Sequence, residues 1–559
     1  MRPTLKTKLI SSLEKCFADE SIESKPALER ISMLRGQQLS FQLVMTETDP
    51  AARGAYRAGL RLGGDLVPYV TVRRVMDIPS QFPCYPEPDD NYLRTTPGLY
   101  PDLLAPLDYD GRPSVMPRQL RTLWFTLNLP DDFAAGEHVL TVELTGGLDE
   151  ALSRNTLHVS LIDAALPPQE LILTQWFYCD CLAQYYNVEV FSERHWEIIE
   201  NFVKTAVANG INLLLTPVFT PALDTHVGGE RLTNQLVDIA RDDGKYSFGF
   251  EKLDRWIDMC DRCGVKYFEI SHFFTQWGAA HAPKVMATVD GEYRRLFGWD
   301  TDATGEEYST FLRTFIPAFL AHMKARSDDK RCFFHISDEP NAEQLEQYRA
   351  SKAVVADLLE GYTIMDALSN FEFYSQGVVK TPIPSTNHIE PFLEADIKGL
   401  WTYYCCGQNR LVSNRFFAMP SARNRIIGVQ MYKYNIAGFL QWGYNFYNTC
   451  HSYNAINPFL DSNGSDWVPS GDTYSVYPAP DGTAWESLRI VVFREALEDM
   501  RALRLCEQLC GRDFVMNLIE GGLDEPITFK NYPREASYLL ELREKVNLAI
   551  AAALAAKKA

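Results

Sequence analysis

The stretch LILTQWFYCDCLAQYYNVEVFSERHWEIIENFVKTAVANGINLLLTPVF, residues 171–219, combines an apolar strand pattern, an amphipathic helix pattern and a second strand pattern. The first predicted strand covers 171–178 and the second covers 212–219. Between them, Ser192 is suited to cap a helix and Gly210 is suited to end it. Such a strand–helix–strand unit predicts two parallel strands joined by a helical crossover.

The same alternation continues along the chain, with further strands predicted at 265–273, 331–337, 362–369, 381–389, 399–405 and 437–445. Eight strands alternating with helices favour a (β/α)8 barrel of the TIM type, with a doubly wound open sheet as the alternative. The strand at 381–389 fits least, because Pro382 and Pro384 are unsuited to a central strand. No glycine-rich phosphate-binding motif follows any strand, so a nucleotide site is not expected.

Before residue 168 the pattern is different. Short runs such as QQLSFQLVM (37–45) and GEHVLTVELT (136–145) alternate with period two and are separated by turn residues. This alternation predicts an antiparallel β-sandwich over residues 1–167. We therefore expect a multi-domain α/β protein, with a barrel domain at 168–559 that includes a C-terminal helical segment from about 484 to 559.

Composition limits the classes of partner and compartment. The formal net charge is −19, with 46% hydrophobic and 23% charged residues, which suits a soluble enzyme and argues against nucleic acid or anionic membrane as a partner. Neither a secretory signal nor a membrane-spanning run is recognisable. Twelve irregularly spaced cysteines predict free thiols and a cytoplasmic location. Cys260 and Cys263 form a CxxC in a helical pattern without a second pair, so no metal site is expected.

Aromatic and polar residues gather where the predicted strands end, which in a barrel is the catalytic face. Sugar rings stack on aromatic side chains while their hydroxyl groups bond to polar ones. The alternative is that these rings simply fill the barrel core. The predicted substrate-binding residues are Trp176, Tyr178, Asp180, His272, Trp277, Asn387, His388, Tyr403, Trp442 and Tyr444.

Two adjacent acids, Asp338 and Glu339, follow the fourth predicted strand in FFHISDEPN (333–341). They could begin a helix, with Asp338 as its N-cap. They could also be catalytic, although ordinary glycosidases place two carboxylates on opposite sides of the bond, roughly 5–9.5 Å apart. Neighbouring acids better suit substrate-assisted hydrolysis, in which one protonates the leaving oxygen and the other orients a 2-acetamido group that acts as the nucleophile.

The sequence resembles glycoside hydrolase family 123, the β-N-acetylgalactosaminidases, over nearly its whole length. The motifs that carry this resemblance are GLYPDLLAPL (98–107), LRTLWFTLNLP (120–130), WFYCDCLAQYYNV (176–188), LLLTPVFTPALDT (213–225), HISDEP (335–340), GDTYSVYP (471–478) and ESLRIVVFREALEDMRAL (486–503).

The resemblance implies a β-sandwich followed by a (β/α)8 barrel, and a retaining glycosidase that releases β-linked N-acetylgalactosamine through an oxazolinium intermediate. It assigns Asp338 to polarising the acetamido group and Glu339 to general acid/base catalysis, with no metal or organic cofactor. The expected partner is a glycan carrying a 2-acetamido sugar. Two alternatives stay open: a non-catalytic sugar-binding barrel, and a conventional retaining glycosidase for another sugar, for which Glu372 is a candidate nucleophile.

Overall fold

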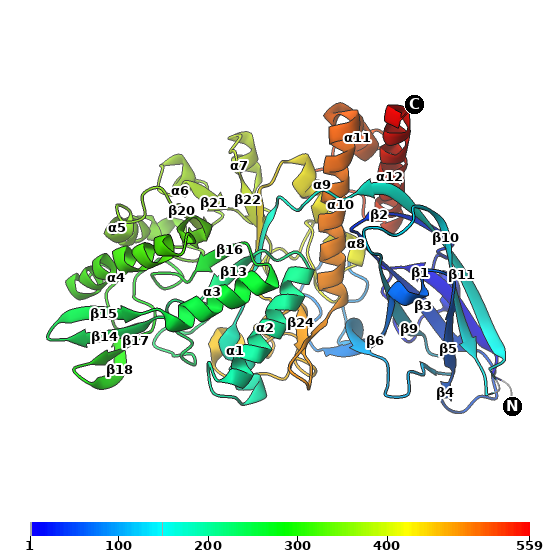
Figure 1. The fold of residues 1–559 in the computed structure, drawn as a ribbon, viewed down its shortest axis with the longest axis horizontal. Coiled ribbons are helices and arrows are strands. Elements are labelled where there is room, and N and C mark those ends of the chain that lie inside the picture. Colours follow the sequence, from blue (N-terminus) through cyan, green and yellow to red (C-terminus); the bar gives the residue numbers. More distant parts are fainter. Residues whose placement is uncertain (1–2, 148, 559) are drawn as a thin grey trace.

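The structure, a computed structural model, describes residues 3–147 and 149–558 and has a mixed α/β architecture. Figure 1 shows the N-terminal β-strands at one end of the molecule and the parallel strands with their helices at the other. The long helix α10 (Leu488–Cys510) stands between these two parts. The chain therefore contains the strand-rich start and the strand–helix alternation that its sequence predicts.

Two sheets make up the N-terminal part in the described residues. The first is antiparallel and has the order β1-β3-β9-β6-β7, and the second has the order β2-β11-β10-β5. Their bounds are β1 (Leu5–Ser11), β3 (Gln38–Glu47), β9 (Arg121–Asn128), β6 (Val70–Ser80), β7 (Gly98–Pro106), β2 (Arg30–Arg35), β11 (Ala151–Ala165), β10 (Gly136–Thr145) and β5 (Gly59–Gly63), with a small pair β4 (Tyr56–Arg57) and β8 (Ser114–Val115).

These two sheets pack face to face. One apolar cluster joins Phe41 of β3 and Phe125 of β9 to Val142 of β10 and Val159 of β11. The two phenylalanine rings stack at 4.9 Å between centroids. The prediction of antiparallel pairing fails at one place, because β2 runs parallel to β11. A single neighbouring strand can pair in parallel here because a long connection separates β2 from β11 in the chain.

The eight strands predicted after residue 170 are all present in the described chain, and each is shorter than predicted. They form two parallel sheets, β12-β23-β22 and β13-β16-β19-β20-β21. Their bounds are β12 (Ile172–Gln175), β13 (Leu213–Thr216), β16 (Tyr267–Ile270), β19 (Cys332–Phe334), β20 (Thr363–Ala367), β21 (Thr381–Ile383), β22 (Trp401–Tyr403) and β23 (Gly438–Gln441). Neighbouring strands follow one another in chain order, and the last strand, β23, pairs with the first, β12. A doubly wound sheet would instead reverse its strand order and leave two open edges.

A few hydrogen bonds link the edges of the two parallel sheets. Between β21 and β22, Ser385 and Tyr403 form an isolated parallel bridge. Between β12 and β13, the backbone N–H of Asn212 donates to the carbonyl oxygen of Leu173 at 3.1 Å. The side chain of Asn212 completes this link, because its Oδ1 accepts from the N–H of Leu173 at 2.8 Å. The polar side chain thus stands in for ladder hydrogen bonds that the short strands lack.

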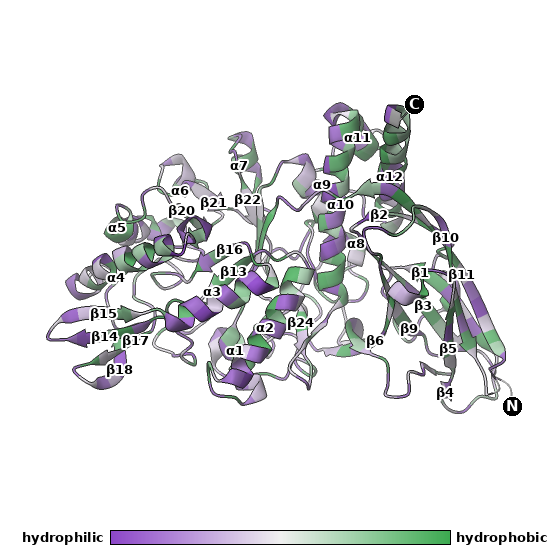
Figure 2. Ribbon diagram, viewed as in Figure 1, coloured by the Kyte–Doolittle hydropathy of each residue, from purple (hydrophilic) through white to green (hydrophobic). Residues whose placement is uncertain are grey.

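The first crossover helix, α2 (Glu193–Ala208), begins and ends as its sequence predicts. The Ser192 hydroxyl accepts from the N–H of His195, and Gly210 has a φ of +89°. Figure 2 shows hydrophilic residues on the outer helices and hydrophobic ones on the central strands β13 and β16. The other helices of this part are α1 (Cys179–Tyr186), α3 (Glu251–Cys263), α4 (Glu306–Ala325), α5 (Leu345–Val355), α6 (Glu372–Ser375), α7 (Glu390–Glu394), α8 (Ser421–Arg425) and α9 (Ile427–Lys433).

Two features surround this core. A four-stranded sheet that the sequence analysis did not anticipate projects from the loops after β13 and β16, with β14 (Asp238–Asp242), β15 (Lys245–Gly249), β17 (Val285–Val289) and β18 (Glu292–Phe297). After the hairpin β24 (Val476–Pro478) and β25 (Ala484–Glu486), the chain ends in α10, α11 (Arg512–Glu520) and α12 (Ala536–Lys558). None of the described helices is long and apolar enough to cross a membrane.

A buried ion pair ties α10 to the N-terminal sheet. Nε of Arg489 donates to Oδ1 of Asp102 on β7 at 2.8 Å, and both side chains are fully buried. The Tyr477 hydroxyl donates to Oδ2 of the same carboxylate at 2.6 Å. Such a pair adds little net stability, but removing one partner leaves a buried charge unpaired. The contact fixes how the two parts of the molecule fit together.

Candidate active site

A cavity of about 180 Å³ opens at the carboxyl ends of the parallel strands. Residues at or shortly after the ends of β12, β19, β20, β22 and β23 line it, together with residues from longer loops. The lining residues are Trp176, Asp224, Trp277, Asp338, Glu339, Ala367, Tyr403, Cys405, Cys406, Leu440, Trp442, His451 and Trp467. Six of the predicted site residues therefore meet in one cavity: Trp176, Trp277, Asp338, Glu339, Tyr403 and Trp442.

The backbone of the acid pair is held from both sides. The N–H of Glu339 donates to the carbonyl oxygen of Ala367 on β20 at 3.0 Å, and the carbonyl oxygen of Asp338 accepts from the N–H of Trp277 at 2.9 Å. Glu339 has a left-handed φ of +43°, which side-chain-bearing residues adopt only where surrounding structure enforces it. The loop thus fixes the direction in which both carboxyl groups point.

The helix-start explanation for the pair does not apply. The following helical turn begins later, with Asn341 as its N-cap and Gln344 completing a capping box. Asp338 is half-buried and Glu339 is exposed to the cavity. Since neither acid caps a helix, their adjacency needs another reason.

Burial and neighbouring charges shape the electrostatics of the cavity. The pKa of Asp338 lies well above its usual range, because the carboxyl is desolvated and faces the charges of Glu339 and Asp224. Burial also raises the pKa of Asp224 to about 7, although Arg231 opposes the shift. The cavity therefore holds more carboxyl groups than it can keep ionised together at neutral pH.

Glu339 has a direct hydrogen-bond donor in the cavity wall. The hydroxyl of Tyr403, at the end of β22, donates to Oε1 of Glu339 at 2.5 Å. Burial raises the pKa of Tyr403 well above its usual range, so the phenol keeps its proton. The bond orients the Glu339 carboxyl and leaves its second oxygen available to a ligand.

Buried carboxylates orient two of the tryptophans. Nε1 of Trp176 donates to Oε1 of Glu269 at 2.8 Å, and Nε1 of Trp442 donates to Oδ2 of Asp472 at 2.8 Å. Because both indole N–H groups are occupied, these rings offer the cavity apolar surface rather than hydrogen-bond donors. Burial raises the pKa of Asp472 to about 6.

Several predicted binding residues lie outside the cavity lining. Both carboxylate oxygens of Asp180 accept from Arg231 at 2.9 Å, so this acid belongs to a buried ion pair. The hydroxyl of Tyr444 donates to the carbonyl oxygen of Phe202 at 2.8 Å, deep in the core. Tyr178 is buried next to the Asp224 carboxyl and lowers the pKa of that group against the larger effect of burial.

The side chains of Asn387 and His388 also lie outside the cavity lining. They form hydrogen bonds with each other at 2.9 Å and with the hydroxyl of Ser385. Gln408 also donates to Oδ1 of Asn387 at 2.9 Å. These bonds satisfy the local loop, so the two residues shape the structure beside the cavity rather than its lining.

Other lining residues were missed by the sequence analysis: Asp224, Cys405, Cys406, His451 and Trp467. Asp224 had a usable signal, because it lies in the motif LLLTPVFTPALDT. Asp472, which holds Trp442, likewise lies in GDTYSVYP. His451 and Trp467 come from a long loop without periodicity, where sequence offers no signal.

A buried polar network lies beneath the cavity. Nε2 of His335 bonds to Oε1 of Glu269 at 2.7 Å and its Nδ1 bonds to Oδ1 of Asp366 at 3.2 Å. The same Asp366 oxygen accepts from the N–H of Ile336 at 3.0 Å. The two carboxylates raise the pKa of His335 to about 9 despite its burial. The network links Trp176 to the segment that carries the acid pair.

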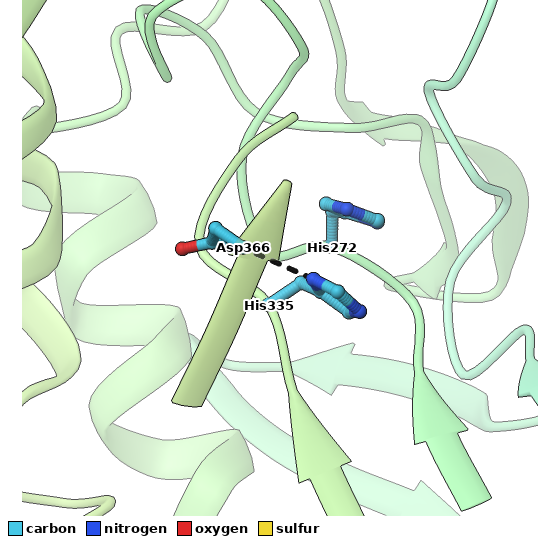
Figure 3. A group of neighbouring side chains, drawn as sticks. All are labelled: His272, His335 and Asp366. Atoms are coloured by element: carbon cyan, nitrogen blue, oxygen red, sulfur yellow. Dashed lines mark hydrogen bonds and ion pairs between the residues drawn. The ribbon is translucent and has the colours of Figure 1, made fainter. Parts of the chain in front are cut away.

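His272, His335 and Asp366 are the described residues with metal-ligating atoms close enough to share an ion, all within 4.8 Å (Figure 3). The two imidazole rings stack on each other, with 4.3 Å between their centroids and an angle of 19° between their planes. Both nitrogens of His335 already bond to carboxylates, which favours a protonated ring over a metal ligand. Burial beside His335 lowers the pKa of His272 well below its usual range.

A family model and a solved structure are each similar to this chain over more than half of its length. Residues 176–506 match the family model described as glycoside hydrolase 123, catalytic domain. Among solved structures, a family 123 glycoside hydrolase from Clostridium perfringens, studied for glycolipid glycan hydrolysis, is similar to this chain with a TM-score of 0.73 and 14% identity, covering 98% of this chain and 97% of that one.

Two further solved structures are less similar. A β-glucuronidase from Parabacteroides merdae has a TM-score of 0.30 and 9% identity over 88% of this chain and 51% of its own. An endo-β-1,4-mannanase from Thermotoga petrophila has a TM-score of 0.32 and 12% identity over 60% and 77%. Both TM-scores lie well below that of the family 123 structure, so nothing about this chain is inferred from these two proteins. No curated protein sequence matches it.

Proposed function

The chain belongs to glycoside hydrolase family 123, and on that premise we propose that it removes β-linked N-acetylgalactosamine from glycans with retention, using the acetamido group of the substrate as the nucleophile. One observation carries the proposal: two adjacent carboxyl groups, Asp338 and Glu339, line a single small cavity walled by aromatic rings. Adjacent acids suit a mechanism in which the substrate supplies the nucleophile.

In the proposed first step, Glu339 protonates the glycosidic oxygen while the acetamido oxygen attacks the anomeric carbon. Asp338 accepts a hydrogen bond from the acetamido N–H and stabilises the positive charge that grows on that nitrogen. The oxazolinium ion forms as the bond to the leaving group breaks. In the second step Glu339, now ionised, removes a proton from water, which attacks the anomeric carbon from the face of the departed group and gives net retention.

The surroundings of the pair support this division of roles. The Tyr403 hydroxyl fixes one oxygen of Glu339, which helps to direct the other toward the glycosidic bond. The pKa of Asp338 is raised because desolvation and the charges of Glu339 and Asp224 destabilise its carboxylate form, so the ionised Asp338 lacks a compensating positive charge among the described residues of the cavity. A positively charged oxazolinium ion is such a charge, so Asp338 stabilises the transition state more than the bound substrate.

We also propose that the two parallel sheets form one (β/α)8 barrel, with a boundary near residue 167 separating it from the N-terminal sandwich. The chain-order succession of strands, the parallel pairing of β23 with β12, and the links at Asn212 and Ser385 support closure. The cavity would then occupy the catalytic face of the barrel.

The function is tested with nitrophenyl glycosides of 2-acetamido sugars. We expect release of nitrophenol from the β-N-acetylgalactosaminide, and proton NMR of the first product should show the β-anomer. The β-N-acetylglucosaminide and the β-galactoside serve as controls for the sugar. A glycolipid glycan, as in the study of the Clostridium perfringens protein, is a natural substrate to include. Failure to hydrolyse any 2-acetamido glycoside would favour a non-catalytic sugar-binding protein.

A conventional retaining mechanism is the second candidate, and Asp224 is the group that favours it. This carboxyl lines the same cavity as Glu339 and has a pKa of about 7. Glu372, the nucleophile considered from the sequence, begins α6 and lies outside the lining. A 2-deoxy-2-fluoro glycosyl fluoride should label an enzymic nucleophile, and peptide mass spectrometry would find the adduct on Asp224 or Asp338. The substrate-assisted mechanism predicts no adduct.

The cytoplasmic location stays a prediction. All twelve cysteines lie in the described part of the chain and are free thiols there, as expected in a reducing compartment.

A further inference from the structure

An aromatic wall continues from the catalytic cavity to the protein surface. Trp467 and His451 line the cavity with ring centroids 6.1 Å apart, and His451 lies 5.4 Å from Trp277 and 6.4 Å from Tyr453. Tyr453 in turn stacks on His226 at 4.2 Å. Trp277 is 38% exposed and Tyr453 is 61% exposed, which is unusual for neighbouring large aromatic residues unless they bind something.

Both sides of this wall are anchored to residues that line the cavity, Asp338 and Asp224. The N–H of Trp277 donates to the carbonyl oxygen of Asp338 at 2.9 Å. On the other side, the Ser452 hydroxyl donates to the carbonyl oxygen of Asp224 at 2.8 Å. The aromatic rings are therefore held at a fixed position relative to the acid pair.

The backbone of the wall is held in an unfavourable conformation. Trp277, His451 and Ser452 have left-handed φ angles of +60°, +52° and +58°. Asp224 and Glu339 in the cavity share this feature, with +49° and +43°. Residues with side chains rarely adopt such angles, and they concentrate at functional sites. The strain supports a role for the wall beyond packing.

The cavity is closed at one end and open at the other. Trp176, Ala367 and Leu440 are buried at its inner end, whereas Trp277 and Glu339 are exposed at its mouth. A terminal sugar that enters with its acetamido group beside Asp338 must leave its glycosidic oxygen facing the mouth, where Glu339 lies. The group attached to that oxygen then extends along the aromatic wall.

We propose that Trp277, His451 and Tyr453 form a second sugar-binding subsite, which binds the ring to which the cleaved residue is attached. This inference rests on the proposed function and makes it more specific: the enzyme acts on the non-reducing end of an oligosaccharide. Aromatic faces bind the apolar faces of sugar rings. Binding energy gained at this remote ring can be used in the transition state at the bond that breaks.

The kinetic test compares a disaccharide with a substrate that is too small to reach the wall. The disaccharide is N-acetylgalactosamine β-linked to galactose, and the small substrate is β-N-acetylgalactosaminyl azide. Trp277→Ala and Tyr453→Ala should lower kcat/KM for the disaccharide by on the order of tenfold more than for the azide. Trp277→Phe should restore most of the loss. Tyr293→Ala, which removes an equally exposed ring from β18, is the matched control.

An equal loss on both substrates, or no loss on either, would overturn the subsite. Since Tyr453 is exposed, its removal should leave folding intact even if Trp277→Ala unfolds the loop.

A binding test separates this inference from the proposed function. In the Glu339→Gln protein, calorimetry with the disaccharide and with free N-acetylgalactosamine needs no turnover. The subsite predicts on the order of tenfold tighter binding of the disaccharide, and Tyr453→Ala should abolish this difference. Equal affinities would overturn the subsite. Tight disaccharide binding by a wild-type protein that hydrolyses nothing would support the subsite and reject the proposed function.

Discussion

Replacing His335 with glutamine should make the stability of the protein depend differently on pH. His335 is fully buried between Glu269 and Asp366, and its pKa in the folded protein is about 9 against 6.5 for an ordinary histidine. The folded state therefore binds the proton more tightly than the unfolded chain. This contribution to stability is complete below pH 6.5 and is lost as the pH rises through about 9.

The size of the effect follows from the shift. A shift of one pKa unit corresponds to about 1.4 kcal/mol, so the proton on His335 contributes up to about 3 kcal/mol to the free energy of unfolding. His335→Gln cannot gain this contribution and leaves two buried carboxylates without their cation. The stability gap between wild type and variant should thus be largest at the acid end of the range, below about pH 6.5, and should shrink by about 3 kcal/mol by pH 9.5.

The assay is chemical denaturation followed by tryptophan fluorescence, at half-unit intervals from pH 6 to 9.5. His388→Gln removes an exposed histidine outside the cavity and is the matched control, for which we expect the wild-type curve. A gap between wild type and His335→Gln that stays constant over this range would refute the protonated histidine. A gap that grows with pH would show that the sign is wrong.

Three further predictions concern the acid pair and the joint between the two parts of the molecule. Glu339→Gln should lower turnover by at least about a hundredfold, with a smaller effect on substrates that have good leaving groups. Glu343→Gln, a nearby control, should have no effect. Steady-state kinetics on aryl glycosides measures both. Asp338→Asn should slow the first chemical step. It should also remove the fall in kcat/KM at acidic pH, because in the wild type that fall reports protonation of Asp338, whose pKa is raised. An unchanged pH profile would show that another group causes the fall. Asp102→Ala should destabilise the protein by about 3–5 kcal/mol, because it leaves the buried Arg489 without its partner carboxylate. In the same denaturation assay Asp357→Ala, which breaks an exposed ion pair with Arg313, should lower the stability by less than about 1 kcal/mol.

The parallel strands could be predicted because each is a short apolar run between helical segments. Even β21 is present, although Pro382 lies within it, but it covers only Thr381–Ile383 of the predicted stretch 381–389. The inserted sheet was missed although its signal was present. Asp243-Gly244 and Asp290-Gly291 form the two-residue turns of its hairpins, all with left-handed φ angles. Asp-Gly between alternating residues is a strong hairpin signal.

The candidate site was predictable where a residue directly follows a strand. Trp176 and Trp442 line the cavity for that reason. Tyr444, two residues after Trp442, does not, because the chain turns after β23 and its side chain enters the core. The alternation of strand side chains ends with the strand. The pairing of Glu269 with His335 joins residues on different strands, and no local pattern predicts such a contact.

The central claim is that the acetamido group of the substrate is the nucleophile. The most direct measurement is kcat/KM for aryl β-galactosaminides whose N-acetyl group carries zero, one, two or three fluorine atoms. Fluorine withdraws electrons from the carbonyl oxygen and weakens it as a nucleophile, while the leaving group and the sugar ring stay the same. We predict a steep decrease along the series, by at least about a hundredfold from N-acetyl to N-trifluoroacetyl. Equal values of kcat/KM across the series would contradict the account and show that the protein supplies the nucleophile.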